Sequence, residues 1–90
     1  MDADDYEIVS RVLASKHRKR VLLELSESAR TPTELADQFD EHQPTISRAL
    51  SELKEMQLVK STSQKQARLY WVPEEKQALV EYIRDREENV

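Results

Sequence analysis

The chain of 90 residues contains no cysteine and no glycine. Without cysteine it has no disulfide, no thiolate metal site and no cysteine nucleophile. Without glycine it has no glycine-rich phosphate loop, and every turn that needs a positive φ must use another residue. We expect Asp40 and the pair Ser63-Gln64 at such turns, because short polar side chains tolerate left-handed geometry better than most.

Long apolar runs are missing as well. No stretch is long enough to span a bilayer, and no secretory signal begins the sequence, so we expect a cytoplasmic protein with no membrane partner. A chain of this length has room for one domain, over residues 1–90. So small a fold buries little apolar surface, and a dimer would therefore add stability.

An excess of positive charge is also absent. The formal net charge is -4, which at first argues against a phosphate-rich partner. The charges are segregated, however, because residues 11–20 and 60–68 hold basic but no acidic side chains, whereas acids gather at 2–7 and 74–88. This polarity suits a protein with one DNA-facing side and one solvated or partner-facing side. Scattered surface charge without a function is the alternative.

The segment 31–56 carries the sharpest functional signal. Its start, Thr-Pro-Thr-Glu at 31–34, combines an N-cap, a proline at the first helical position and a capping box. Residues 40–42 interrupt the apolar pattern, and a second helix is predicted from residue 43. Two short helices joined by such a turn predict a helix-turn-helix, whose second helix enters the DNA major groove by its N-terminal end.

The second of these helices, over 43–56, is amphipathic. Apolar residues recur at helical spacing along one side, which indicates burial of that side. The opposite side carries short hydrogen-bonding groups and one guanidinium, which are suited to base edges and phosphates. The DNA contacts expected from this helix are Gln43, Pro44, Thr45, Ser47, Arg48 and Ser51.

After residue 56 the apolar period changes from helical to two. The β-prone runs 58–62 and 67–72 predict a hairpin around 63–66. We expect Leu69 and Trp71 to point inward, which leaves Lys65 and Arg68 available to the DNA backbone.

Three further helices are predicted, over 5–14, 16–27 and 74–88. The middle one is capped by Ser15, and Arg18 and Arg20 near its N-terminal end are expected to hold DNA phosphates; a solvated helix start is the alternative. The outer two have apolar stripes richer than a small core requires, which favours a homodimer seam over completion of the monomer core. The seam residues expected are Tyr6, Val9, Leu79, Tyr82 and Ile83.

The order helix, helix, helix-turn-helix, hairpin, helix resembles winged helix-turn-helix transcriptional regulators of the ArsR-like and MarR-like type, in particular small archaeal ones. The resemblance covers about residues 10–83, and its most specific part is Gln-Pro-Thr-Ile-Ser-Arg-Ala-Leu at 43–50. It implies a mainly α fold with a small β-hairpin (α-α-α-α-β-β-α), with 43–56 as recognition helix, 58–72 as wing and 74–88 as dimerisation helix. Where these regulators usually have Gly, an apolar residue and Ser, this chain has Asp40, Glu41 and His42, which implies a looser turn and a weaker helix cap.

The sequence therefore favours a sequence-specific transcriptional regulator that binds double-stranded DNA as a homodimer. The alternative is a winged-helix protein–protein interaction module without DNA binding, which Glu41, Glu52 and Glu55 favour because carboxylates repel phosphates. Catalysis is not expected, since His17 and His42 stand in no recognisable nucleophile or metal spacing. No cofactor is expected, and the cysteine pair of metal-sensing members is missing. The sequence leaves open whether a small-molecule effector exists; an effector would have to bind at the dimer seam.

Overall fold

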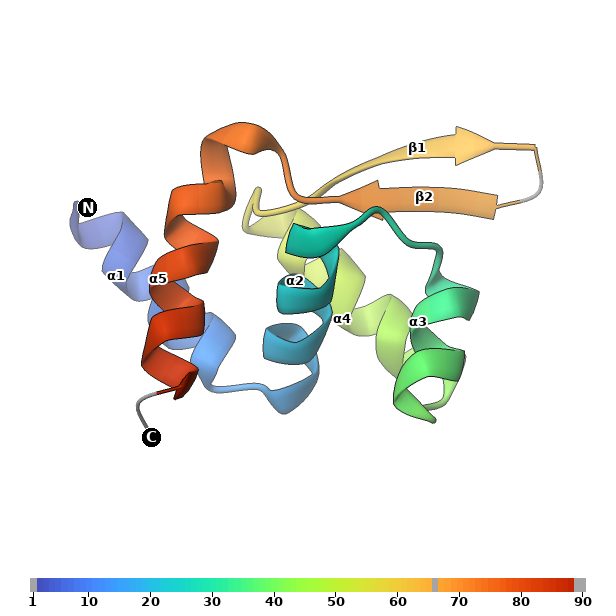
Figure 1. Cartoon of the computed structure of the whole chain (residues 1–90), viewed down its shortest axis with the longest axis horizontal. Helices are drawn as coiled ribbons and strands as arrows, with labels where there is room; N and C mark the ends of the chain where they lie inside the picture. The colour runs from blue at the N-terminus through green and yellow to red at the C-terminus, as the bar shows by residue number, and fades with distance from the viewer. Residues whose placement is uncertain (1, 66, 89–90) are drawn as a thin grey trace.

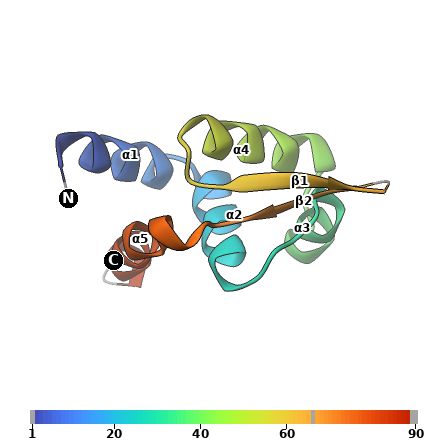
Figure 2. The ribbon, with the colours of Figure 1, turned by 90° about the horizontal axis from the view of Figure 1, so that it is seen from above.

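The computed structural model describes residues 2–65 and 67–88. Over these residues α1 and α5 lie at one end of the molecule and the tip of a hairpin lies at the other, with the remaining helices between them (Figures 1 and 2). This order confirms the mainly helical fold with one small hairpin. The elements are α1 (Ala3–Leu13), α2 (Lys16–Glu27), α3 (Pro32–Phe39), α4 (Gln43–Glu55), β1 (Lys60–Gln64), β2 (Ala67–Trp71), the 3-10 helix η1 (Glu74–Lys76) and α5 (Gln77–Glu88).

Side-chain caps fix the starts of the helices. The hydroxyl of Thr31 accepts from the backbone N–H of Glu34 at 3.2 Å, and the Glu34 carboxylate accepts from the backbone N–H of Thr31 at 2.8 Å. This capping box confirms the predicted start of α3. Ser15 caps α2 through the backbone N–H of Arg18, as expected. The His42 side chain makes no capping hydrogen bond to α4, so α4 begins without the side-chain cap usual at a helix start.

The turns that follow α3 and α4 are built without glycine. Asp40 takes the left-handed conformation at φ 52, as predicted, and the next N–H, that of Glu41, donates to the carbonyl of Ala36 at 2.9 Å. Gln57 does the same after α4 at φ 63, where the N–H of Leu58 donates to the carbonyl of Leu53 at 3.0 Å. Both helices therefore end in a Schellman-type turn, which satisfies carbonyls that would otherwise lack a partner.

The expectation that Ser63-Gln64 would supply positive φ at the hairpin is wrong. Both residues continue the ladder of β1, with Ser63 opposite Arg68 and Gln64 opposite Ala67. The positive φ falls one position later, at Lys65, where φ is 39. The predicted final helix is also modified, because η1 precedes α5 at its N-terminal end.

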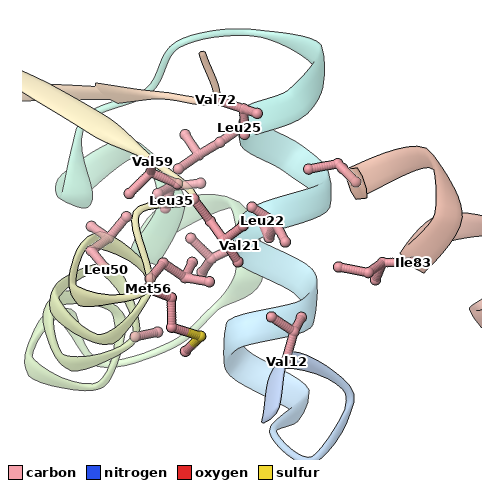
Figure 3. Packing of buried hydrophobic residues seen from close by; sticks show 14 of the residues in the cluster. Val12, Val21, Leu22, Leu25, Leu35, Leu50, Met56, Val59, Val72 and Ile83 are labelled. Carbon is pink, nitrogen blue, oxygen red and sulfur yellow. The ribbon is translucent and has the colours of Figure 1, made fainter. Parts of the chain in front are cut away.

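The hydrophobic core lies around α2. Val21, Leu22 and Leu25 of α2 are buried, and α2 contacts α1, α4, α5 and β2 (Figure 3). The apolar sides of the other helices converge on this central helix, as the amphipathic spacing predicts. The other buried residues are Val9, Val12, Leu35, Ala36, Ile46, Ala49, Leu50, Leu53, Met56, Leu58, Val59, Val72, Leu79, Val80 and Ile83.

The expectation that Leu69 and Trp71 would form the inward face of the hairpin is wrong, because the opposite face packs against the helices. Leu69, Tyr70 and Trp71 are all partly buried, but of these three only Tyr70 packs against the hydrophobic core. The reason lies far away in sequence: Arg30 forms a β-bridge with Tyr70, with backbone hydrogen bonds of 3.0 and 2.9 Å. This bridge holds the start of α3 against β2 and turns the Tyr70 face of the hairpin toward α2 and α3.

Among the helices described here, none combines the length and apolar content needed to cross a membrane.

Candidate nucleic-acid interface

Helix α4 is anchored along one side and open along the other. Ile46, Ala49, Leu50 and Leu53 are buried, so the apolar side predicted from sequence is confirmed. Of the α4 residues expected to contact DNA, Thr45 is half-buried and the rest are exposed. The exposed ones are Gln43, Pro44, Ser47, Arg48 and Ser51. The arrangement presents amide, hydroxyl and guanidinium groups on a rigid support.

An ion pair joins α4 to the start of α2. Arg18 Nη1 donates to Glu52 Oε1 at 3.1 Å, while Arg18 Nε and Nη2 donate to the backbone carbonyl of Arg11 at 3.0 and 2.6 Å. Arg18 thus connects the C-terminal end of α1, the start of α2 and the side of α4. Its predicted role toward a phosphate would have to coexist with these contacts.

Two of the carboxylates that argue against DNA binding are occupied by basic partners. Glu52 is paired with Arg18, and Glu41 Oε2 lies 3.8 Å from Nδ1 of His17. Both partners come from the N-terminal end of α2, and the guanidinium of Arg18, which is always charged, offsets the negative charge of Glu52. Glu55 is exposed on α4.

A hollow of about 410 Å³ separates the start of α2 from α4. Arg18 and Arg48 line it from opposite helices, together with Ser15, Thr45 and Glu52. Arg20 lies elsewhere, because its guanidinium carbon is 4.4 Å from the centroid of the Phe39 ring on α3. That cation–π contact packs α3 against α2.

The wing extends beyond the helices at the end of the molecule opposite to α1 and α5 (Figure 2). Lys65 is exposed at the turn, and Arg68 is exposed on β2. Both predicted wing cations therefore reach solvent on the same extension. Residue 66 of the turn lies outside the described residues.

The predicted seam residues separate into buried and accessible ones. Val9, Leu79 and Ile83 lie in the core of the single chain, and Ile83 has 0% of its surface exposed. Tyr6 is 54% exposed and meets the half-buried Tyr82 edge-on, with ring centroids 6.4 Å apart. The accessible part of the predicted seam is therefore the surface around the two tyrosines.

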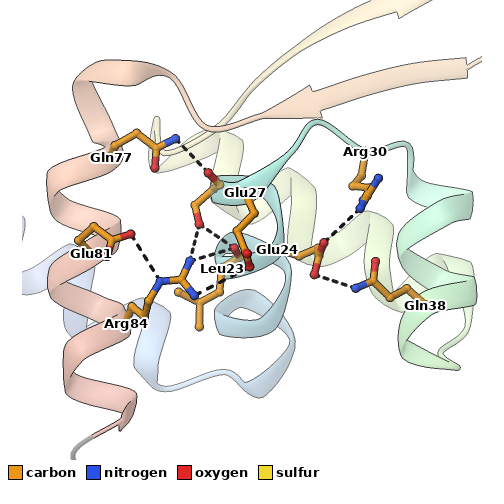
Figure 4. A network of polar contacts seen from close by, with 9 residues as sticks. Leu23, Glu24, Glu27, Arg30, Gln38, Gln77, Glu81 and Arg84 are labelled. Atoms are coloured by element: carbon orange, nitrogen blue, oxygen red, sulfur yellow. Dashed lines mark hydrogen bonds and ion pairs between the residues drawn. The ribbon is translucent and has the colours of Figure 1, made fainter.

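Polar contacts at the C-terminal end of α2 fix the helices on either side of it (Figure 4). Arg84 of α5 donates to the carbonyl of Leu23 at 3.3 Å and to Ser26 Oγ at 2.7 Å. On the opposite side, Glu24 accepts from Gln38 of α3 at 2.7 Å. A cation at a helix C-terminus is stabilised by the helix dipole, so Arg84 docks α5 onto α2.

Two glutamates of the described residues have pKa values lowered by local hydrogen bonds. The backbone hydrogen bond from Thr31 lowers the pKa of Glu34, which is a capping effect. A hydrogen bond to its own backbone, with a smaller contribution from Lys60, lowers the pKa of Glu75. In the described part of the chain, no group of His, Asp and Glu side chains is arranged to hold a metal ion.

Comparison with known proteins identifies both a sequence family and a set of similar folds. The profile described as the HVO_A0261 N-terminal domain matches residues 6–69. No curated protein sequence gives a significant match.

Three solved structures illustrate the likeness in fold. The transcriptional regulator HlyU from Vibrio vulnificus CMCP6 is 22% identical, with 89% of this chain and 85% of that one aligned at a TM-score of 0.74. The adhesin competence repressor AdcR from Streptococcus pyogenes is 15% identical, covering 92% and 69%, with a TM-score of 0.72. A mutant of ZitR from Lactococcus lactis is 19% identical, covering 83% and 53%, with a TM-score of 0.77. The chain therefore spans about half the length of ZitR. At these identities the likeness shows the winged helix-turn-helix fold.

Proposed function

Since this chain belongs to the HVO_A0261 N-terminal domain family, we propose that it is a sequence-specific regulator of transcription that binds double-stranded DNA. Helix α4 would enter the major groove and the wing would follow the backbone. The names of two proteins of similar fold, a transcriptional regulator and a competence repressor, support a regulatory and non-enzymatic role.

One observation supports this proposal most strongly: the polar side of α4 is exposed, while its apolar side is buried in the core. Gln43 has the amide geometry that pairs with adenine, and Arg48 the guanidinium that pairs with guanine. Thr45, Ser47 and Ser51, with Pro44 beside them, would contact base edges or phosphates. Lys65 and Arg68 of the wing, with Arg18 and Arg20 of α2, would position the backbone.

A homodimer completes the proposal. The accessible tyrosines of α1 and α5, Tyr6 and Tyr82, lie at the end opposite to the wing tip, so pairing there would leave both wings outermost (Figure 2). Two recognition helices related by a two-fold axis read half-sites about 34–36 Å apart or a multiple of this. The expected DNA site is therefore pseudo-palindromic.

The alternative is a winged-helix module that binds proteins and not DNA. One observation favours it: Glu55 is exposed on α4, where a carboxylate close to a DNA phosphate would be repelled. The ion pair of Glu52 with Arg18 of α2 removes part of the same objection. We therefore place DNA binding first.

Selection of bound fragments from random duplex DNA, together with the mass of the protein in solution, tests the proposal. We expect enrichment of one pseudo-palindromic sequence, an affinity that falls steeply with salt, and the mass of a dimer. Absence of duplex binding even at low salt would contradict the proposal and support the interaction module.

A further inference from the structure

Two cations from different elements converge on one hydroxyl between α4 and the wing. Lys54 Nζ of α4 donates to Ser61 Oγ of β1 at 3.0 Å, and Arg68 Nη1 of β2 donates to the same oxygen at 3.2 Å. The two positive groups are thus within two hydrogen-bond lengths of each other. Lys54 was not among the DNA contacts predicted from sequence.

No carboxylate compensates these charges. Among residues 2–65 and 67–88, no ion pair includes Lys54 or Arg68. The nearby Glu52 is paired with Arg18 instead. Lys60, next to Ser61, points to the other face of the hairpin and is paired with Glu75 at 3.6 Å. Because like charges repel, two adjacent cations without a counter-charge favour an anion from outside the chain.

The free groups of the cluster are hydrogen-bond donors. A serine hydroxyl has two acceptor lone pairs and one proton, and in Ser61 both lone pairs receive bonds from the cations. The proton of Ser61 is therefore left to donate to a third group. An ammonium has three donors and a guanidinium five, so Lys54 and Arg68 also retain donors after binding Ser61. A cluster of donors and positive charge is suited to an oxyanion.

The position of the cluster in the fold favours a phosphate of the DNA backbone as this anion. The cluster lies where the C-terminal end of α4 leads into β1, because the Lys54–Ser61 hydrogen bond joins these two elements, and both Lys54 and Arg68 are exposed. Along α4 it follows Ser47 and Ser51 on the outward side. With α4 in the major groove, as proposed above, the oxyanions that flank the helix are the phosphates of the DNA backbone.

We propose that Lys54, Ser61 and Arg68 form one binding site for a single DNA phosphodiester, which clamps the backbone between the recognition helix and the wing. This inference rests on the proposed function, since it requires that α4 faces duplex DNA. The site would act on all sequences alike, because phosphates carry no base identity.

The salt dependence of binding to a duplex selected by the protein tests the charges. Affinity falls as salt rises, and a plot of log affinity against log salt has a negative slope. Lys54→Gln and Arg68→Gln should each make this slope less steep by up to about 0.9, the value for one phosphate contact. Ser61→Ala should weaken binding and leave this slope unchanged, because it removes a donor and no charge. Lys60→Gln is the matched control, since it removes a paired lysine one residue away, and its slope should stay close to that of the wild type. Thermal unfolding of each variant confirms that it is folded.

Neutral methylphosphonate groups placed one at a time along the same duplex test whether the cations share a phosphate. At one backbone position, a methylphosphonate should weaken binding of the wild type. At the same position, it should no longer weaken binding of either Lys54→Gln or Arg68→Gln. If the wild type binds the duplex but the two variants lose sensitivity at different positions, or at none, the shared site is wrong while DNA binding stands. If the wild type binds no duplex, the proposed function fails and this site fails with it.

Discussion

The guanidinium of Arg18 and the carboxylate of Glu52, 3.1 Å apart, join the start of α2 to the side of the recognition helix. The same guanidinium binds the carbonyl of Arg11 at the end of α1. One side chain of α2 therefore binds both α1 and α4.

Arg18 should contribute more to the free energy of unfolding than its partner Glu52. The Arg18 side chain is only 19% exposed, and Arg18→Met removes hydrogen bonds to both Glu52 and Arg11, which should lower the free energy of unfolding by about 1–3 kcal/mol. Glu52→Gln keeps an oxygen acceptor and should cost less than about 1 kcal/mol. Urea unfolding of both variants measures the difference, and an equal loss in the two would show that the contacts to Arg11 contribute nothing.

Arg48 should determine part of the sequence preference. The side chain is exposed on α4, and Arg48→Ala should weaken specific binding by about 1–3 kcal/mol and relax the preference at one base pair of each half-site. Affinity for the selected duplex and for single-base variants of it measures both effects. If affinity and base preference are both unchanged, the side chain does not read the DNA.

Lys65 should contribute to DNA affinity without selecting a base sequence. Lys65→Ala removes an exposed charge at the wing turn, so it should weaken selected and unrelated duplexes by the same factor and reduce the salt dependence. Parallel titrations of two unrelated duplexes provide the comparison. A change in preference between them would assign base readout to the wing.

The dimer should depend on Tyr6 more than on the apolar residues beneath it. Tyr6→Glu places a charge on the accessible part of the α1–α5 surface, so the solution mass should fall to that of a monomer that remains folded. Tyr6→Phe, which keeps the ring, should remain a dimer. By contrast Ile83→Ala opens a cavity in the core and should cost about 2–5 kcal/mol of stability. An unchanged mass for Tyr6→Glu would place the seam elsewhere.

The capping box of α3 should make stability depend on acidic pH. Its hydrogen bonds lower the pKa of Glu34 from the ordinary value of 4.5 in the folded protein. The ionised carboxylate therefore stabilises the fold above pH 4.5, and this contribution is lost as the pH falls through the lower pKa of the folded state. Glu34→Gln should reduce the loss of thermal stability between neutral pH and this acid range. Equal pH profiles for variant and wild type would show that the carboxylate cap does not contribute.

Local chemistry made most of the fold predictable. Some features depend only on residues close together in the sequence, and they can be predicted without the rest of the chain. These are the cap at Thr31, the left-handed conformation of Asp40 and the apolar spacing along 43–56. The same holds for the polar side of α4, because anchoring one side of a helix exposes the other.

Contacts between distant segments were not predictable in the same way. The inward face of the hairpin depends on the bridge between Arg30 and Tyr70, and both faces of β2 carry β-prone residues. Periodicity likewise shows that Val9 and Ile83 belong to apolar stripes, yet it does not show that other helices of the same chain cover them. The meeting of Lys54 and Arg68 at Ser61 needs the three-dimensional junction of α4 with the wing.

The most direct test of the account is the change in backbone amide NMR shifts of the labelled protein when a selected duplex is added. We predict that the changes concentrate at the outward residues of 43–51 and along the wing at 60–68, while α1 and α5 change little. Changes confined to α1 and α5, with the exposed side of α4 unaffected, would contradict the assignment of α4 as the helix that reads DNA.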